Sequence, residues 1–338
     1  MRKDRGAALL LVLLLVALLA VIVLEFQRRA RVDLHAAENL RDDLQAHALL
    51  RSGSGVAEQL LVIYSKNSVG DMKSYATTEK GGELFWNFLF AGEPLEVPPP
   101  SAAIDAAAGL RARLRDLYGC FPLGALVGDA VEPRRTMFKY FLGHVKEYLG
   151  SHDDPRLEKV DPEGLAEAII EKLMGAPTDQ PPISSLDELA GVEGFTPEIL
   201  RAFRPFLDVR KEWKFNANAR CVPLIMTMQT KTVDEAVDIR QVLMDDPIPK
   251  DSAIPNAAEL GGLSPEFAGS LAIKSSRVEI LFEAEVNGGI RRARAVYQLP
   301  PQTTASAKFY LARWEEGWVD EEIGAPERKP QTTKGKTP

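Results

Sequence analysis

The chain has 338 residues, of which 45% are hydrophobic and 26% are charged, and its formal net charge is −7. This composition is typical of a globular protein of one to three domains, and the negative charge disfavours nucleic acid as the main partner. With four histidines, two cysteines and no phosphate-binding or metal-ligand motif, the sequence suggests no catalytic site. We therefore expect a protein that is not an enzyme.

An uncharged apolar run, residues 7–24, follows a short basic tag. As a helix this run would span about 27 Å, close to the ~30 Å hydrocarbon core of a bilayer. It is longer than the apolar region of a secretory signal, and residues 24–27 lack the small-x-small site at which such signals are cut. We predict a transmembrane helix over 7–24. Arginines on both sides leave its orientation open.

Gly6 separates the basic tag from the apolar run. A glycine weakens the helix that it precedes, so it has no evident use in an ordinary anchor. It would serve a peptidase that cuts between Gly6 and Ala7 and leaves the apolar helix on the mature protein, an arrangement that resembles the type IV prepilin signal. Most such subunits carry Glu at the fifth mature position, which here is Leu11. The missing Glu counts against a major pilin and matches one particular minor subunit.

A polar sequence compatible with a helix continues over residues 25–66. Apolar or small residues recur in it at three- and four-residue spacing, at Leu34, Ala37, Leu40, Leu44 and Ala48. We predict a solvated helix whose apolar stripe contacts either a soluble domain or neighbouring subunits. The Ser-Gly-Ser-Gly stretch at 52–55 weakens the pattern, and marks either a kink or a close approach of another backbone.

Helical patterns dominate from residue 134 to residue 212. Residues 137–149 and 162–174 form amphipathic segments, and Asp161 can cap the second. A capping box at 185–188 and a cap at Thr196 predict two short helices across Gly194, a helix-hairpin-helix-like unit. Such units bind DNA phosphates in some proteins. The acidic residues slightly outnumber the basic ones here, which favours a packing module.

Four segments favour β-structure, namely 113–126, 213–228, 277–299 and 308–316. The strongest is 277–299, where apolar and mostly polar residues alternate and Asn287-Gly288-Gly289 has hairpin chemistry. The predicted order is therefore a long helix, strands, a helical insertion and further strands.

Taken in order, these features resemble the minor pseudopilin K family of type II secretion systems (GspK). Besides the leader that lacks Glu, DLYGCFPL (116–123) is similar to the family's D-x-x-G-R-F-N-L-N strand, with Cys120 and Pro122 in place of Arg and Asn. SLDEL (185–189) with VEG (192–194) matches S-L-x-E-L-x-x-V-x-G, and FNANA (215–219) matches I-N-V-N-T-A. The family's D-W-x-D-x-D stretch is missing near 165–174.

The resemblance implies an α+β fold, in which a pilin-like long helix packs on an antiparallel sheet that is interrupted by a large all-α insertion. It implies a single-pass inner-membrane protein whose bulk is periplasmic, at the tip of the pseudopilus. The minor pseudopilins I and J are the implied partners, with H, the major pseudopilin G and the prepilin peptidase as further ones, and no nucleic acid. A tip subunit has no neighbour above it whose amino terminus needs a Glu, which explains Leu11.

The expected division has seven parts. They are the leader (1–6), the transmembrane helix (7–24), the periplasmic part of the helix (25–66), the first part of the pilin-like domain (67–133), the inserted helical domain (134–212), the second part of the pilin-like domain (213–324) and a disordered tail (325–338). A minor pilin of a type IV pilus and a membrane-anchored DNA receptor are the alternative functions.

Family members can bind calcium in the helical domain. His152, Asp153, Asp154 and Asp161 are acidic or metal-binding residues in this region, but surface carboxylates explain them as well, so we assign no calcium site and no other cofactor.

Cys120 and Cys221 are the only cysteines, and each lies in a segment that flanks the helical insertion. In an oxidising compartment such a pair often forms a disulfide, with two buried free thiols as the alternative. Closing a loop of about 100 residues would stabilise the fold by roughly 4–5 kcal/mol in the chain-entropy model.

Overall fold

The protein is represented by a computed structural model. It describes residues 4–78, 86–97, 108–128, 131–150, 157, 160–176, 182–218, 221–256, 262–264, 267, 269–300 and 308–317, with the side chains of α1 described from Val12 onward.

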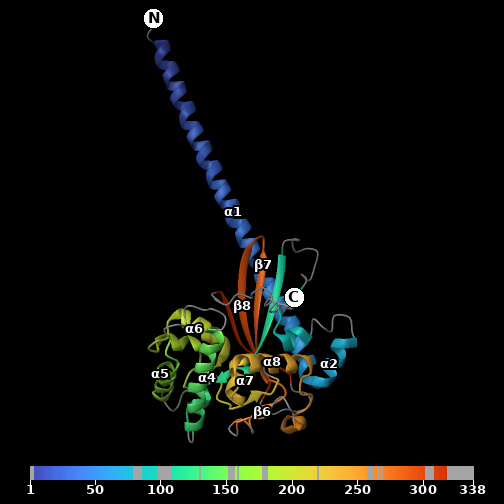
Figure 1. Ribbon diagram of the computed structural model, residues 1–338. Coiled ribbons are helices and arrows are strands. Elements are labelled where there is room, and N and C mark those ends of the chain that lie inside the picture. Colours follow the sequence, from blue (N-terminus) through green and yellow to red (C-terminus); the bar gives the residue numbers. More distant parts are fainter. Residues whose placement is uncertain are drawn as a thin grey trace, which may run out of the picture.

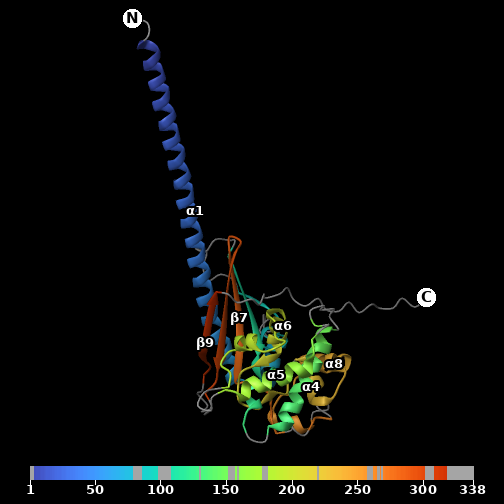
Figure 2. The same ribbon diagram turned by 90° about the vertical axis from the view of Figure 1, so that its left-hand side faces the viewer.

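A single helix, α1 (Asp4–Lys66), runs for 63 residues and extends far beyond the rest of the molecule (Figures 1 and 2). This confirms the helix predicted to end at residue 66. The Ser-Gly-Ser-Gly stretch lies inside it without interrupting it. At its end, the Lys274 ammonium donates hydrogen bonds to the carbonyls of Tyr64 (2.9 Å) and Asn67, which satisfies carbonyls that the helix leaves unpaired.

A five-stranded antiparallel sheet packs against the second half of α1. Its strand order is β1-β2-β7-β8-β9, with bounds β1 (Leu95–Val97), β2 (Ala108–Asp116), β7 (Arg277–Val286), β8 (Gly289–Gln298) and β9 (Tyr310–Gly317). The predicted hairpin is confirmed, and Asn287 (φ 50°) and Gly288 (φ 83°) form its turn. The predicted strand 308–316 is β9.

The first hydrophobic core lies between α1 and the sheet. Alternate residues of β2, namely Leu110, Ala112 and Leu114, face it, as do Ile280 and Phe282 of β7. This is the expected class of fold, a long helix packed on an antiparallel sheet.

A helical unit interrupts the sheet between β2 and β7. Its first helices are α4 (Glu132–Gly150), α5 (Pro162–Met174) and α6 (Pro197–Phe203), with a 3-10 helix, Leu186–Gly191, before α6. The predicted caps are confirmed, because Asp161 accepts a hydrogen bond from the backbone of α5, and Ser185 with Glu188 completes the capping box. Gly194 has a φ of 82°, which makes the turn between the two short helices.

The prediction of a strand over 213–228 is wrong for most of its length. Only β5 (Phe215–Asn216) is extended, paired in parallel with β6 (Leu271–Ala272), and a buried helix, α7 (Val222–Gln229), follows. Periodicity cannot separate a short buried strand from a buried helix, because both are apolar all round. A further helix, α8 (Val233–Asp245), comes next, so helical structure continues well beyond residue 212.

The remaining β-prediction, 113–126, is correct only in part. β2 ends at Asp116, and two short 3-10 helices then flank β3 (Phe121–Pro122), which pairs with β4 (Leu207–Asp208). Phe121 lies in the centre of a second core, with ring centroids 5.1 Å from Phe138 and 4.8 Å from Phe141. A short helix, α2 (Val69–Thr78), follows α1 directly.

Charged residues cover the face of the sheet that is turned away from α1. Glu283 of β7 pairs with Arg111 and Arg292 on the neighbouring strands, and Glu279 pairs with Arg115 at 2.9 Å. Both carboxylates are at least 95% buried, so each needs these cations to offset its lost hydration. Arg115 also donates a hydrogen bond to the carbonyl of Arg204 at 3.1 Å, which links this charged face to the helical unit.

Candidate assembly site

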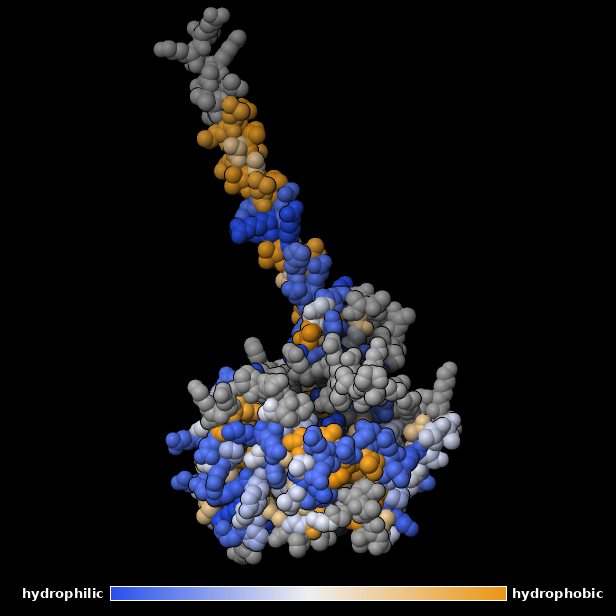
Figure 3. Space-filling model, viewed as in Figure 1, coloured by the Kyte–Doolittle hydropathy of each residue, from blue (hydrophilic) through white to orange (hydrophobic). Residues whose placement is uncertain are grey.

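The first part of α1 is not covered by the rest of the chain. Every large apolar side chain from Val12 to Leu24 exposes between 50% and 72% of its surface. Figure 3 shows a hydrophobic band on the projecting helix, followed by a hydrophilic one. In the sequence, Arg28, Arg29 and Arg31 follow the apolar run. Burying one such side chain is favourable by roughly 1.5–3 kcal/mol of free energy. The described residues of this chain do not provide that burial for the band.

Among the residues that the structure describes, no helix combines the length and the apolarity needed to cross a membrane. The predicted span begins at Ala7, and the side chains of its first five residues lie outside the described ones.

The apolar stripe beyond residue 24 also stays exposed. Leu34, Leu40 and Leu44 each expose 58–60% of their surface, and charged pairs such as Arg41–Asp42 (3.1 Å) lie between them. The head of this chain therefore does not cover the stripe.

The second part of α1 is held by close packing. Leu49, Leu50 and Leu61 are fully buried against the sheet. A Cβ added to Gly53 would lie 2.6 Å from Leu110 Cδ2 and 3.2 Å from the Phe282 ring, so this glycine permits the close approach of helix and sheet. A Cβ on Gly55 would meet nothing within 4 Å. The groups that approach Gly53 are therefore side chains of this chain's own sheet, and not another backbone as one of the two alternatives for 52–55 predicted.

A hydrogen bond fixes the register of helix and sheet at the same level. The hydroxyls of Ser54 and Tyr297 lie 2.8 Å apart in the core. Burial raises the pKa of Tyr297 to about 12. The tyrosine therefore stays neutral at physiological pH and can serve as a hydrogen-bonding group in an apolar core.

Four ionisable side chains surround the point where α1 leaves the sheet. Glu316 of β9 lies 2.6 Å from His47 Nδ1 and 2.7 Å from Arg291 Nη1, and Arg291 also pairs with Asp43 at 2.6 Å. Burial acts to raise the pKa of Glu316, but hydrogen bonds from His47, Arg291 and Trp314 outweigh it and hold this pKa below its usual value. We call this group the exit clamp.

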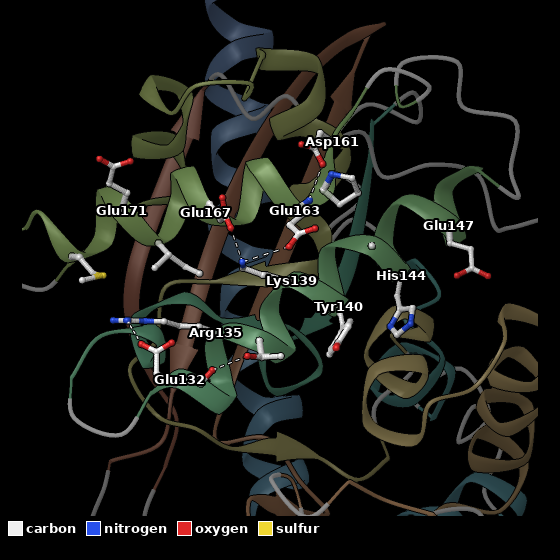
Figure 4. Close-up of a pocket in the computed structure, with 15 residues that line it drawn as sticks. Glu132, Arg135, Lys139, Tyr140, His144, Glu147, Asp161, Glu163, Glu167 and Glu171 are labelled. Atoms are coloured by element: carbon white, nitrogen blue, oxygen red, sulfur yellow. Dashed lines mark hydrogen bonds and ion pairs between the residues drawn. The ribbon is translucent and has the colours of Figure 1, made fainter.

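A groove opens between α4 and α5 in the helical unit (Figure 4). It has a volume of about 1100 Å³ and is lined by Glu132, Arg135, Thr136, Lys139, Tyr140, Gly143, His144, Glu147, Asp161, Pro162, Glu163, Glu167, Ile170, Glu171 and Met174. Lys139 lies in its centre, 2.6 Å from Glu167 and 3.7 Å from Glu163. Burial lowers the pKa of His144, whose Nδ1 is hydrogen-bonded to Thr227 at 2.9 Å. No sequence motif marked this groove, because its residues come from two helices.

The residues predicted for leader cleavage lie at the start of α1. Gly6, Ala7 and Leu11 fall within the helix, but their side chains are outside the described residues. Processing at Gly6 therefore stays a prediction.

The predicted disulfide is not formed in this structure. Cys120 and Cys221 are both free thiols, and Cys120 Sγ lies 3.4 Å from the carbonyl oxygen of Pro205. Burial raises the pKa of both thiols, that of Cys221 to about 12. Both thiols are therefore protonated at neutral pH in this conformation.

The calcium candidates are not gathered into a site in the described part of the chain. His152, Asp153 and Asp154 lie outside it, and Asp161 caps α5. Within the described residues no group of three or more potential ligands could hold a metal ion.

The helix-hairpin-helix-like unit packs into the second core. Leu189, Phe195 and Phe203 are buried there, Arg204 pairs with Asp187, and Arg210 is 3% exposed. These contacts fit the packing module that the charge balance favoured.

No family model and no curated protein matches the chain. Among solved structures, the chain is similar to one in the crystal structure of the GspK–GspI–GspJ complex from the type 2 secretion system of enterotoxigenic Escherichia coli. The two are 14% identical with a TM-score of 0.45, over 79% of this chain and 99% of that one.

Proposed function

We propose that this protein is a minor pseudopilin of a type II secretion system, anchored in the inner membrane with its head in the periplasm. In this role it stands at the tip of the pseudopilus with the minor pseudopilins I and J, and starts assembly for protein export. The role is structural and involves no catalysis.

One observation carries the proposal, namely the division of α1 into a packed and an uncovered part. Residues 46–64 supply the head with core side chains, while large apolar side chains from Val12 to Leu44 are exposed. A soluble protein gains nothing from a long apolar helix in water. A filament subunit needs it, because the same helix anchors the subunit before assembly and packs among neighbouring helices afterwards.

The leader supports the same role. Gly6 gives a peptidase a place to cut before the apolar run, and Leu11 occupies the fifth mature position. A subunit without Glu at this position cannot neutralise the amino terminus of a neighbour, which fits a place at the end of the filament.

Processing tests the proposal most directly. Co-expression with a prepilin peptidase should give a mature chain that begins at Ala7, as measured by intact mass, and Gly6→Val should block this cleavage. Gly55→Ala, a substitution in the same helix away from the cleavage site, should be processed normally. An assembled protein that still begins at Met1 or Arg2 would contradict the proposal.

Assembly provides the second test. The double variant Leu40→Arg/Leu44→Arg places charges in the exposed stripe, so it should lose co-purification with subunits I and J while its head keeps its melting temperature. Val242→Arg on α8, also at an exposed apolar position, should retain the complex. Retention of the complex by the double variant would exclude this stripe as the contact. Association with type IV pilins instead would favour the pilus alternative.

A further inference from the structure

The groove between α4 and α5 carries an uncompensated negative charge. Six of its lining side chains are carboxylates and two are cations, which gives a formal charge of −4 with His144 neutral. Both cations already pair with acids of the groove, Arg135 with Glu132 and Lys139 with Glu167, each at 2.6 Å. In the part of the chain that the structure describes, the side chains of Glu147 and Glu171 have no hydrogen bond or ion pair.

The groove also offers an apolar wall. Tyr140 exposes 63% of its surface and Met174 exposes 56%, with the buried Ile170 between the two helices. Figure 4 shows Tyr140 on α4 beside Lys139, with His144 between it and Glu147. Carboxylates around an exposed aromatic ring suit a cationic segment, because ammonium and guanidinium groups bind both carboxylates and ring faces.

The chain contains such a segment after β9. Residues 325–338 hold Arg328, Lys329, Lys334 and Lys336 against Glu327 alone, a formal charge of +3, and they lie outside the described residues. Their prolines and threonines favour an extended chain, which can lay separate cations along a groove.

The chain between β9 and this segment is long enough to span the distance along α5. In β9, Arg313 donates a hydrogen bond to the carbonyl of Ser184 at 3.3 Å, shortly after α5 in the chain. Lys172 of α5 acts electrostatically on Glu188 of the same region. The eleven residues that follow Gly317, up to Arg328, span up to roughly 36 Å when extended, whereas α5 itself is about 20 Å long.

We propose that the α4–α5 groove binds the chain's own basic C-terminal segment, residues 325–338, through an electrostatic contact within one molecule. Contacts between exposed charges are individually weak, but a short tether gives the segment an effective concentration in the millimolar range. This proposal does not depend on the role in secretion.

Cross-linking of the full chain in detergent tests where the segment lies. A carbodiimide, which joins an amine to a carboxylate with loss of water, should link Lys329, Lys334 or Lys336 to groove carboxylates of the same molecule. Peptide mapping identifies the links, and a mixture of isotopically labelled and unlabelled chains separates links within one chain from links between two. Links to another surface, or mainly between chains, would overturn the proposal.

Binding of a peptide tests which residues hold it. A fluorescent peptide of residues 325–338 should bind the chain truncated after Gly324, and binding should weaken from 50 to 500 mM NaCl. Glu147→Gln/Glu171→Gln should weaken it by about 2- to 30-fold, since each exposed pair contributes modestly. Glu193→Gln, at an exposed acid outside the groove, should leave it unchanged. Equal affinity in the double variant and its parent, or no saturation at millimolar peptide in low salt, would refute the proposal.

Discussion

The two parts of α1 belong to one continuous helix but have different surroundings. From Ala46 to Tyr64 the buried residues form one stripe that faces the sheet, whereas from Val12 to Leu24 apolar side chains are exposed around the whole circumference. A helix with one apolar stripe is built to lie on a core, and a helix that is apolar all round is built for surroundings without water. The exit clamp, in which Glu316 forms ion pairs with His47 and Arg291, marks the boundary between the two parts.

Two leucine-to-alanine substitutions, one in each part of α1, should differ most in their effect on the stability of the head. Leu50→Ala empties a fully buried site and should lower the free energy of unfolding of the head by about 2–5 kcal/mol, through lost burial and the remaining cavity. Leu44→Ala, six residues earlier in the helix and 60% exposed, should change it by less than about 0.5 kcal/mol. Denaturant unfolding in detergent measures both, and similar effects of the two variants would show that the boundary is misplaced.

Two glycine-to-alanine substitutions test how closely the packed part of α1 approaches the sheet. Both Gly53→Ala and Gly55→Ala gain the same helix propensity, but only the Cβ at position 53 meets Leu110 and Phe282. Gly53→Ala should therefore be less stable than Gly55→Ala by about 1–3 kcal/mol. Thermal unfolding of the two variants checks this, with the parent chain as reference. A Gly53→Ala chain at least as stable as Gly55→Ala would refute the close approach.

The exit clamp should give a smaller effect that depends on pH. Because the pKa of Glu316 is lower in the folded chain, folding keeps this group ionised, so its contribution is present above the usual pKa near 4.5 and is lost as the pH falls through the folded value. Glu316→Gln should cost about 1–2 kcal/mol at pH 7 and progressively less in acid. Unfolding at several pH values measures this difference. A constant cost at every pH would mean that the ion pairs do not contribute.

Local signals in the sequence predicted those elements whose formation depends on neighbouring residues. The caps at Asp161, Ser185 and Thr196 and the turn at Asn287 were confirmed because each is decided within four residues. The helix Val222–Gln229 was missed because all eight of its residues are buried, and an apolar run of this length fits a strand equally well. The exit clamp and the groove were also missed, since their side chains come from segments far apart or from separate helices.

Local features of the sequence are enough to predict one long helix that ends at residue 66 and has an apolar first part, because helix propensity and the absence of proline act locally. They also predict the hairpin and the capped helices. The tertiary structure is needed to tell which stretch of that helix is covered, because both stretches carry leucines among polar residues. Leu34, Leu40 and Leu44 are exposed, whereas Leu49, Leu50 and Leu61 are buried. The sheet covers the second, where Gly53 lets Leu110 of β2 and Phe282 of β7 pack closely on α1, and leaves the first exposed.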